Sequence, residues 1–164
     1  MNESGLLKLH TDIVHPEWID YNGHMNLAFF VMAFDFATDE FFDYIGMDEA
    51  YRVSSGCSLY LLETHVTYVS QMLEGERMRF ETQLLDYDHK RVHMFHFMYH
   101  QDQNTLAATT ELMFVHVDTT EDHSSPMPGD MCDRLQQVLQ SHQQLPRPEH
   151  AGSVIGMRRP QPAG

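Results

Sequence analysis

The sequence predicts an α+β fold in which an antiparallel sheet wraps around one long central helix, and three observations lead to it. Residues 27–45 follow a helical period, and the first half is apolar on nearly every side, so this helix must be buried on several sides. Four later segments of strand length alternate between apolar and polar residues. The links between the last three are short, which favours antiparallel neighbours. A curled sheet can enclose such a helix, so we expect one domain over residues 1–145.

The size and charge of the chain narrow the class of protein. It has 164 residues, which fits one domain with a substantial core, and a formal net charge of −14, which disfavours binding to nucleic acid. No apolar run approaches the ~18 residues that cross a bilayer, and residues 1–10 lack the apolar core of a signal peptide. Its two cysteines make no disulfide framework. We therefore expect a cytoplasmic protein without a nucleic-acid or membrane partner.

The elements follow in a simple order. Residues 9–14 form a short apolar strand, and residues 15–26 form a loop with a turn-prone Asn22-Gly23 pair. Asn26 is a suitable N-cap for the helix, and Gly46 suits the position just past its end. One apolar face of the helix comprises Leu27, Phe30, Val31, Phe34, Thr38, Phe41, Phe42 and Ile45.

The period then changes to two. The expected strands cover residues 58–70, 77–86, 91–100 and 106–117. In the first strand we expect one face to carry Tyr60, Leu62, Val66 and Tyr68, and the other Glu63, His65 and Thr67.

A short polar helix and a tail complete the chain. Residues 130–144 are typical of a short helix, and residues 146–164 form a Pro-rich tail that we expect to be partly ordered, with residues 153–157 docking. A sheet of this kind leaves an edge strand open, and pairing between subunits closes it. We therefore expect a homodimer or homotetramer with active sites at the subunit interface.

The loop before the helix carries the residues with the clearest chemistry. Backbone N–H groups near Asn26 to Ala28 can polarise a carbonyl oxygen at the helix N-terminus. The Asp20 carboxylate can attack that carbonyl or activate a water molecule, and His24 can orient the acid or donate to a leaving group. Asn22 and Asn26 can hold either partner in place, although Asn26 is equally suited to capping. This arrangement suits acyl transfer.

The series Asp20-x-Asn22-x-His24-x-Asn26, followed by an aromatic-rich helix, resembles the start of hotdog-fold acyl thioesterases of the 4-hydroxybenzoyl-CoA and acyl-ACP types. The resemblance implies a hotdog fold with Asp20 as the catalytic carboxylate and Asn22 and His24 as further functional residues. It also implies an acyl-CoA substrate, with no metal or bound cofactor.

Five segments of the sequence narrow the resemblance to one family. They are similar to the betainyl-CoA thioesterase family of carnitine breakdown, which implies release of glycine betaine and CoA. The blocks are residues 16–25, 62–65, 90–96, 106–109 and 112–118.

A betainyl-CoA substrate requires residues that bind a quaternary ammonium and residues that bind phosphates. A quaternary ammonium favours aromatic faces and a nearby carboxylate. The candidate side chains for this group are Trp18, Tyr21, Tyr60 and Glu63, with Asn26 beside the thioester. For the phosphates of CoA we favour the Lys90-Arg91 pair over Arg158-Arg159 in the tail.

Several alternatives stay open. Some hotdog thioesterases use a helix acid, which would make Asp35 or Asp39 the base in place of Asp20. A hotdog hydratase or dehydratase and a non-catalytic acyl-CoA-binding module are rival functions, and the pocket could take an aromatic or medium-chain acyl group.

A metal site is disfavoured for the His-rich segment. His93 and His96 point to opposite faces of a strand, and neither these residues nor His89 and His100 have tetrahedral ligand spacing.

Overall fold

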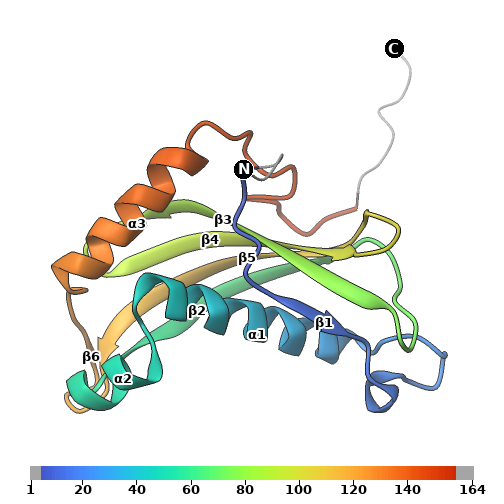
Figure 1. Ribbon diagram of the computed structural model, residues 1–164, viewed down its shortest axis with the longest axis horizontal. Coiled ribbons are helices and arrows are strands. Elements are labelled where there is room, and N and C mark those ends of the chain that lie inside the picture. Colours follow the sequence, from blue (N-terminus) through green and yellow to red (C-terminus); the bar gives the residue numbers. More distant parts are fainter. Residues whose placement is uncertain (1–4, 158–164) are drawn as a thin grey trace.

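A six-stranded antiparallel sheet curls around α1 (Leu27–Ile45) in the computed structural model, which describes residues 5–157 (Figure 1). The strand order is β1-β3-β4-β5-β2, and a short β6 pairs with β5. The strands are β1 (Thr11–Ile13), β2 (Cys57–Tyr68), β3 (Arg77–Tyr87), β4 (Arg91–His100), β5 (Thr105–Asp118) and β6 (His123–Ser124). The other elements are a 3-10 turn (Pro16–Trp18), α2 (Glu49–Ser55) and α3 (Gly129–His142). The predicted fold class is confirmed.

The ends of α1 are those that the sequence predicts. The Asn26 side chain accepts a hydrogen bond of 2.9 Å from the N–H of Ala28, which caps the first turn. Gly46 ends the helix with a φ of 91°, a left-handed conformation that costs a glycine little. Both ends are thus fixed by local chemistry.

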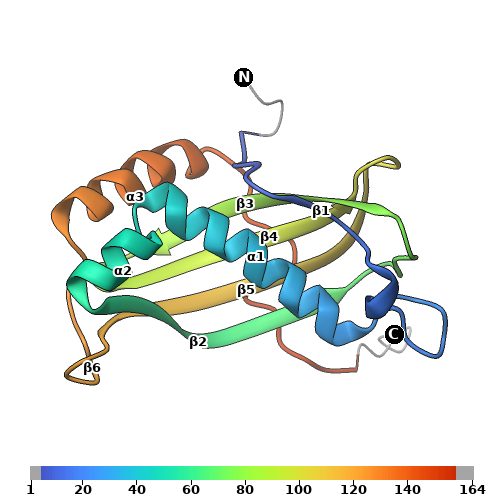
Figure 2. The same cartoon turned by 60° about the horizontal axis from the view of Figure 1, so that its bottom comes forward.

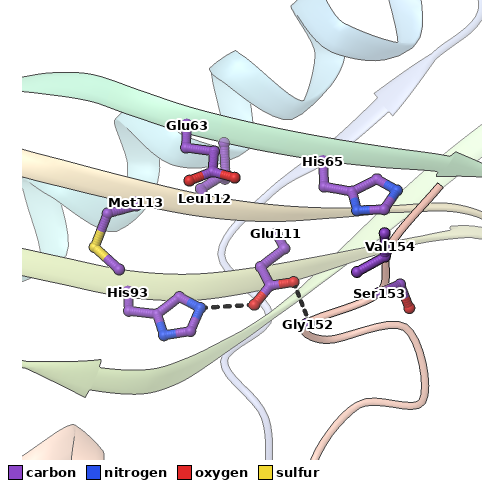
Figure 3. Close-up of a pocket in the computed structure, with 9 residues that line it drawn as sticks. All are labelled: Glu63, His65, His93, Glu111, Leu112, Met113, Gly152, Ser153 and Val154. Atoms are coloured by element: carbon purple, nitrogen blue, oxygen red, sulfur yellow. Dashed lines mark hydrogen bonds and ion pairs between the residues drawn. The ribbon is translucent and has the colours of Figure 1, made fainter.

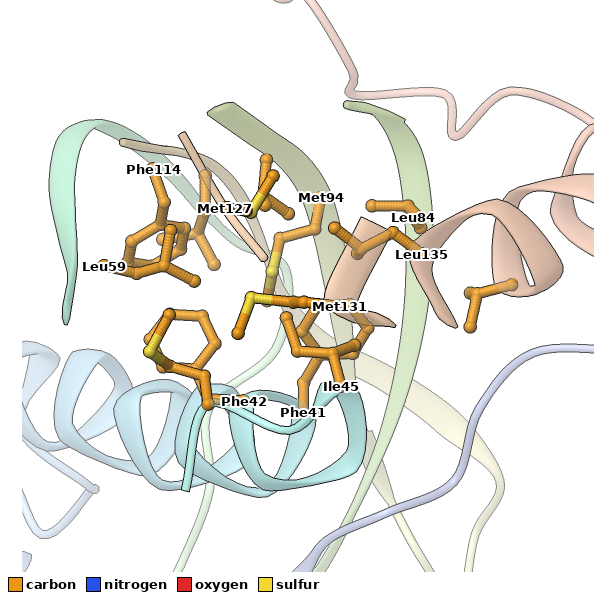
Figure 4. Packing of buried hydrophobic residues seen from close by; sticks show 14 of the residues in the cluster. Phe41, Phe42, Ile45, Leu59, Leu84, Met94, Phe114, Met127, Met131 and Leu135 are labelled. Atoms are coloured by element: carbon orange, nitrogen blue, oxygen red, sulfur yellow. The ribbon is translucent and has the colours of Figure 1, made fainter. Parts of the chain in front are cut away.

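The core fills the space between α1, α3 and the concave face of the sheet. Phe41 and Ile45 of α1 are fully buried, and they meet Met131 and Leu135 of α3 (Figure 4). A second cluster surrounds Phe34 and the first half of α1. Removal of this apolar surface from water is the main force holding the helix against the sheet.

The predicted strands are confirmed, but one predicted face is wrong. A β-bulge lies between Leu61 and Glu63, so Tyr60 pairs with Val115 and Glu63 pairs with Met113. Tyr60 therefore lies on the outer face of the sheet with Glu63, and not on the face of Val66 and Tyr68. The extra residue of the bulge reverses the alternation at this point.

The short helix α2 was not predicted. Asp48 caps it by accepting a hydrogen bond of 2.8 Å from the N–H of Tyr51. None of its residues is buried, so it leaves no apolar period in the sequence.

The segment after α3 crosses the outer face of the sheet. Figure 2 shows it passing behind the strands from the β3 side toward β2. The Gln83 side chain donates a hydrogen bond of 3.3 Å to the carbonyl of Pro146, and the N–H of Gly152 donates one of 2.6 Å to Glu111. The last seven residues of the predicted tail lie outside the described part of the chain. Within residues 5–157, no helix is long and apolar enough to cross a membrane.

A histidine is buried between α1 and the sheet. His96 lies between two threonines, with Nδ1 2.8 Å from Thr82 Oγ1 and Nε2 3.1 Å from Thr38 Oγ1. Thr38 donates its own proton to the carbonyl of Phe34 at 2.9 Å, so it accepts from Nε2–H of a neutral imidazole. Burial, and to a smaller extent the nearby His10, lower the pKa of His96 to about 3.

We predict that His96 makes the protein less stable in acid. Between pH 6.5 and about 3 the unfolded chain binds a proton at His96 that the folded chain excludes, so the free energy of unfolding falls as the pH falls through this window. Urea unfolding from pH 7 to pH 4 should show a steeper loss for the wild type than for His96→Gln. Equal slopes for the two proteins would contradict the prediction.

Candidate active site

The loop that precedes α1 is held closed by its own hydrogen bonds. The N–H of Asp20 donates to the carbonyl of His24 at 2.9 Å, and the N–H of Gly23 donates to the carbonyl of Asp20 at 2.9 Å. The N–H of Asn22 donates to Asp20 Oδ1 at 2.8 Å. Gly23 has a φ of 78°, which a side chain would disfavour. The loop therefore fixes the Asp20 carboxylate and leaves its second oxygen without a hydrogen-bond partner within residues 5–157.

Asp20 and His24 line one cleft at the N-terminus of α1. The cleft has a volume of about 350 Å³ and is walled by Leu27 and Phe30 of α1 and by Tyr68 at the end of β2, among others. It therefore offers a carboxylate, an imidazole and apolar walls to one ligand. This is the arrangement that the sequence predicts for an acid and base acting on a carbonyl.

The amide groups of the helix N-terminus are less available than expected. The N–H of Asn26 donates to the carbonyl of Trp18 at 2.9 Å, and the N–H of Ala28 is taken by the Asn26 cap. Among the three expected amides, that of Leu27 is left without a partner in the described part of the chain. Leu27 lines the cleft, so its N–H and the positive end of the helix dipole are suited to a carbonyl oxygen there.

The other predicted residues of this loop lie in three different settings. Trp18 is 5% exposed and its ring stacks on Phe29 at 5.6 Å, so it supports the loop from inside the core. Asn22 is exposed, and Tyr21 is 96% exposed beside Asp20. Asn26 acts as the cap, which leaves its amide nitrogen for a ligand.

The alternative helix acids lie beside a second groove. This groove holds about 440 Å³ between α1 and strands β2 and β5, and Asp35 lies on its lining with Val31. Asp39 is exposed one turn further on. Partial burial, followed by repulsion from Asp35, raises the pKa of Asp39. Val31 lies one turn after Leu27 in α1, so the groove lies one helical turn from the cleft, a suitable place for an acyl group.

The predicted CoA-binding pair lies at the far end of the sheet. Arg91 faces Val115, which pairs with Tyr60 at the start of β2, whereas the cleft lies beside Tyr68 at its end. Eight residues of strand separate these points, which is roughly 26 Å. Within one chain, Tyr60, Lys90 and Arg91 are therefore remote from Asp20.

The two cations of that pair have different partners. Arg91 donates from Nε to Asp88 at 2.8 Å. Partial burial opposes ionisation of Asp88, but hydrogen bonds from Arg91 and from the backbone outweigh it and lower the pKa of Asp88 to about 2. Among the described residues, the Lys90 ammonium reaches only the Ser124 hydroxyl, at 3.1 Å. Lys90 is thus the more available cation for a phosphate.

Glu63 lines a separate pocket on the outer face of the sheet (Figure 3). This pocket of about 370 Å³ also contains His65, the His93–Glu111 pair at 2.8 Å, and the C-terminal segment. Sequence reasoning missed Glu111, because only the pairing of β5 with β2 and β4 brings it to this place. No group of three or more His, Cys, Asp or Glu side chains suited to a metal occurs within residues 5–157.

Comparison with known proteins assigns the class. The chain belongs to the thioesterase-like superfamily, whose family model matches residues 14–135. The predicted hotdog thioesterase fold and the predicted thioester hydrolase class are thereby confirmed. The fold also matches a Staphylococcus aureus protein solved in complex with CoA, with a TM-score of 0.86 and 27% identity over 96% of this chain and 100% of that one.

Two curated relatives are more specific. The chain is 38% identical to a betainyl-CoA thioesterase of Pseudomonas aeruginosa over 94% of its own length and 97% of that protein. It is also 38% identical to an L-carnitine dehydrogenase/betainyl-CoA thioesterase of Agrobacterium fabrum, over 91% of this chain but 30% of that longer protein. The predicted resemblance to betainyl-CoA thioesterases is confirmed.

We predict that Asn26→Ala lowers the free energy of unfolding by about 1 kcal/mol, because the N–H of Ala28 loses its cap. Asn26→Ser should keep most of the stability, since a serine oxygen can also cap. Urea unfolding at neutral pH measures both effects, and an alanine variant as stable as the serine variant would contradict the capping role.

Proposed function

We propose that the protein hydrolyses betainyl-CoA to glycine betaine and CoA, with Asp20 as the catalytic carboxylate. The observation that supports this most is the one cleft that Asp20, His24 and Leu27 line together. The curated relatives support the substrate.

In the proposed reaction, the thioester carbonyl oxygen accepts the N–H of Leu27 at the positive end of α1. The Asp20 carboxylate either attacks the carbonyl carbon, giving a mixed anhydride that water hydrolyses, or takes a proton from a water that attacks directly. In both routes the C–S bond breaks and the CoA thiolate leaves, with His24 placed to return a proton. Labelled water separates the routes, because only the first puts solvent oxygen into Asp20. No metal or bound cofactor takes part.

The proposal requires two subunits. Strand β2 is an edge strand of 12 residues, and its Tyr60, Leu61 and Leu62 are 49%, 48% and 59% exposed. Leu27 and Val31 of α1 are 65% and 43% exposed along the same edge. Antiparallel pairing of β2 with its copy would cover this apolar surface and close the sheet.

This pairing would also assemble the separated residues. An antiparallel two-fold near the middle of β2 places the Tyr68 end of one strand beside the opposite end of the other. The cleft of Asp20 would then lie near Lys90 of the partner subunit, which is free to bind a CoA phosphate. Tyr60 and Glu63 point to the outer face of the sheet, opposite α1, so this pairing does not bring them to the cleft. We place the reaction in the cytoplasm, because Cys57 and Cys132 are both free thiols.

We predict that betainyl-CoA is cleaved much faster than benzoyl-CoA or decanoyl-CoA, and that Asp20→Asn lowers kcat by about a thousandfold. Free-thiol release measures both, and Glu17→Gln, an exposed acid in the same loop, is the matched control that should keep its rate. If another ester is preferred while Asp20→Asn is inactive, the substrate is wrong. If the wild type releases no thiol from any ester, a binding module or a hydratase replaces the proposal.

We predict that Lys90→Ala raises KM about tenfold with little change in kcat, because it loses a charged contact to phosphate that is the same in ground and transition states. Arg91→Ala should have a smaller effect, since Asp88 already holds that guanidinium. Arg134→Ala on α3, far from β2, is the control. An unchanged KM in Lys90→Ala would remove this residue from the CoA site.

A further inference from the structure

The C-terminal segment is firmly attached to the outer face of its own sheet. Glu111 of β5 accepts two hydrogen bonds there, one from the N–H of Gly152 at 2.6 Å and one involving His93 at 2.8 Å (Figure 3). The Gln83–Pro146 bond holds the segment further back, over β3. The segment therefore has a fixed path that leads across the strands toward the edge at β2.

The residues that follow this attachment are apolar and exposed to solvent. Val154 still lines the outer pocket beside Glu63 and His65 of the edge strand. Val154, Ile155 and Met157 are nevertheless 92%, 89% and 85% exposed. Figure 2 shows the segment emerging past the β2 edge. Such a run of exposed apolar residues is unusual on a chain that has no neighbour.

We propose that Val154–Met157 is an arm that packs on the outer face of a second copy of this chain. The inference rests on the dimer of the proposed function, because a copy paired at β2 would present its outer face directly beyond this edge. Four extended residues span about 13 Å, more than two strand spacings of about 4.8 Å, so the arm can reach the partner's first strands. There Tyr60 of the partner subunit, which lies half exposed on the outer face, offers an apolar contact, and two-fold symmetry exchanges two identical arms.

Apolar side chains on the outer face favour the same partner. The outer surface next to the arm is not uniformly acidic, because the bulge turns the apolar Tyr60 ring to the side that also carries Met113. Each arm would thus join an apolar contact on the partner to a polar anchor, Glu111, on its own chain. Exchange of this kind stabilises a dimer without adding to the strand interface itself.

The first test is the dimer dissociation constant, measured by dilution in analytical ultracentrifugation. We expect Ile155→Asp combined with Met157→Asp to weaken the dimer by tenfold or more. The matched control is Ile13→Asp, which puts a charge on the 43% exposed side chain of the opposite edge strand β1 and should not change the constant. Thermal melting shows that each variant is folded. An unchanged constant in the double variant overturns the arm.

A crosslink distinguishes exchange from docking on the same chain. In a background with Cys57→Ser and Cys132→Ser, Ile155→Cys and Tyr60→Cys should form covalent dimers on mild oxidation. Crosslinks confined to single chains, or none in a protein that is still dimeric, overturn the proposal. A wild type that is monomeric at every concentration would overturn both the arm and the dimer, whereas an intact dimer with no effect of the arm overturns the arm alone.

Discussion

The apolar surface of α1 is the constraint on which the rest of the structure depends. The sheet curls because it must cover Phe34, Phe41 and Ile45, which are buried against its concave face. The sheet does not reach around to Leu27 and Val31, which stay exposed along β2. One helix therefore organises the core and also leaves an apolar seam that only another molecule can cover.

The same helix positions the proposed active site. Its N-terminus is capped by Asn26, and the closed loop before it presents Asp20 and His24 to the cleft. A helix held rigidly by its core contacts keeps the Leu27 N–H at a fixed position relative to these side chains. In the proposed mechanism, packing energy and catalytic geometry thus come from a single element.

Several arginines are already paired with carboxylates, so few cations remain available to a ligand. Arg77, Arg79 and Arg91 each have a carboxylate partner, so their charge is largely neutralised locally. Lys90 keeps only a hydroxyl partner within residues 5–157. An acidic protein that handles a phosphate-bearing ligand can do so with few cations, provided that those it uses are not already paired.

Local features were predictable from the sequence, and long-range ones were not. The ends of α1 follow from Asn26 and Gly46, and the loop of Asp20 follows from its own turn residues. The bulge at Leu62 was not predictable, because an extra apolar residue in an alternating strand looks like a normal position. The contact of Glu111 with the C-terminal segment and the separation of Lys90 from Asp20 depend on strand register, which short sequence patterns do not fix.

The central claim is that each active site combines residues of two subunits, and complementation between inactive variants tests it most directly. Asp20→Asn and Lys90→Glu would be mixed, allowed to exchange subunits, and assayed for thiol release at a low concentration of betainyl-CoA. Random mixing gives heterodimers with one intact site, so the account predicts recovery of about a quarter of the wild-type rate. No recovery, although native mass spectrometry shows that heterodimers have formed, would contradict it.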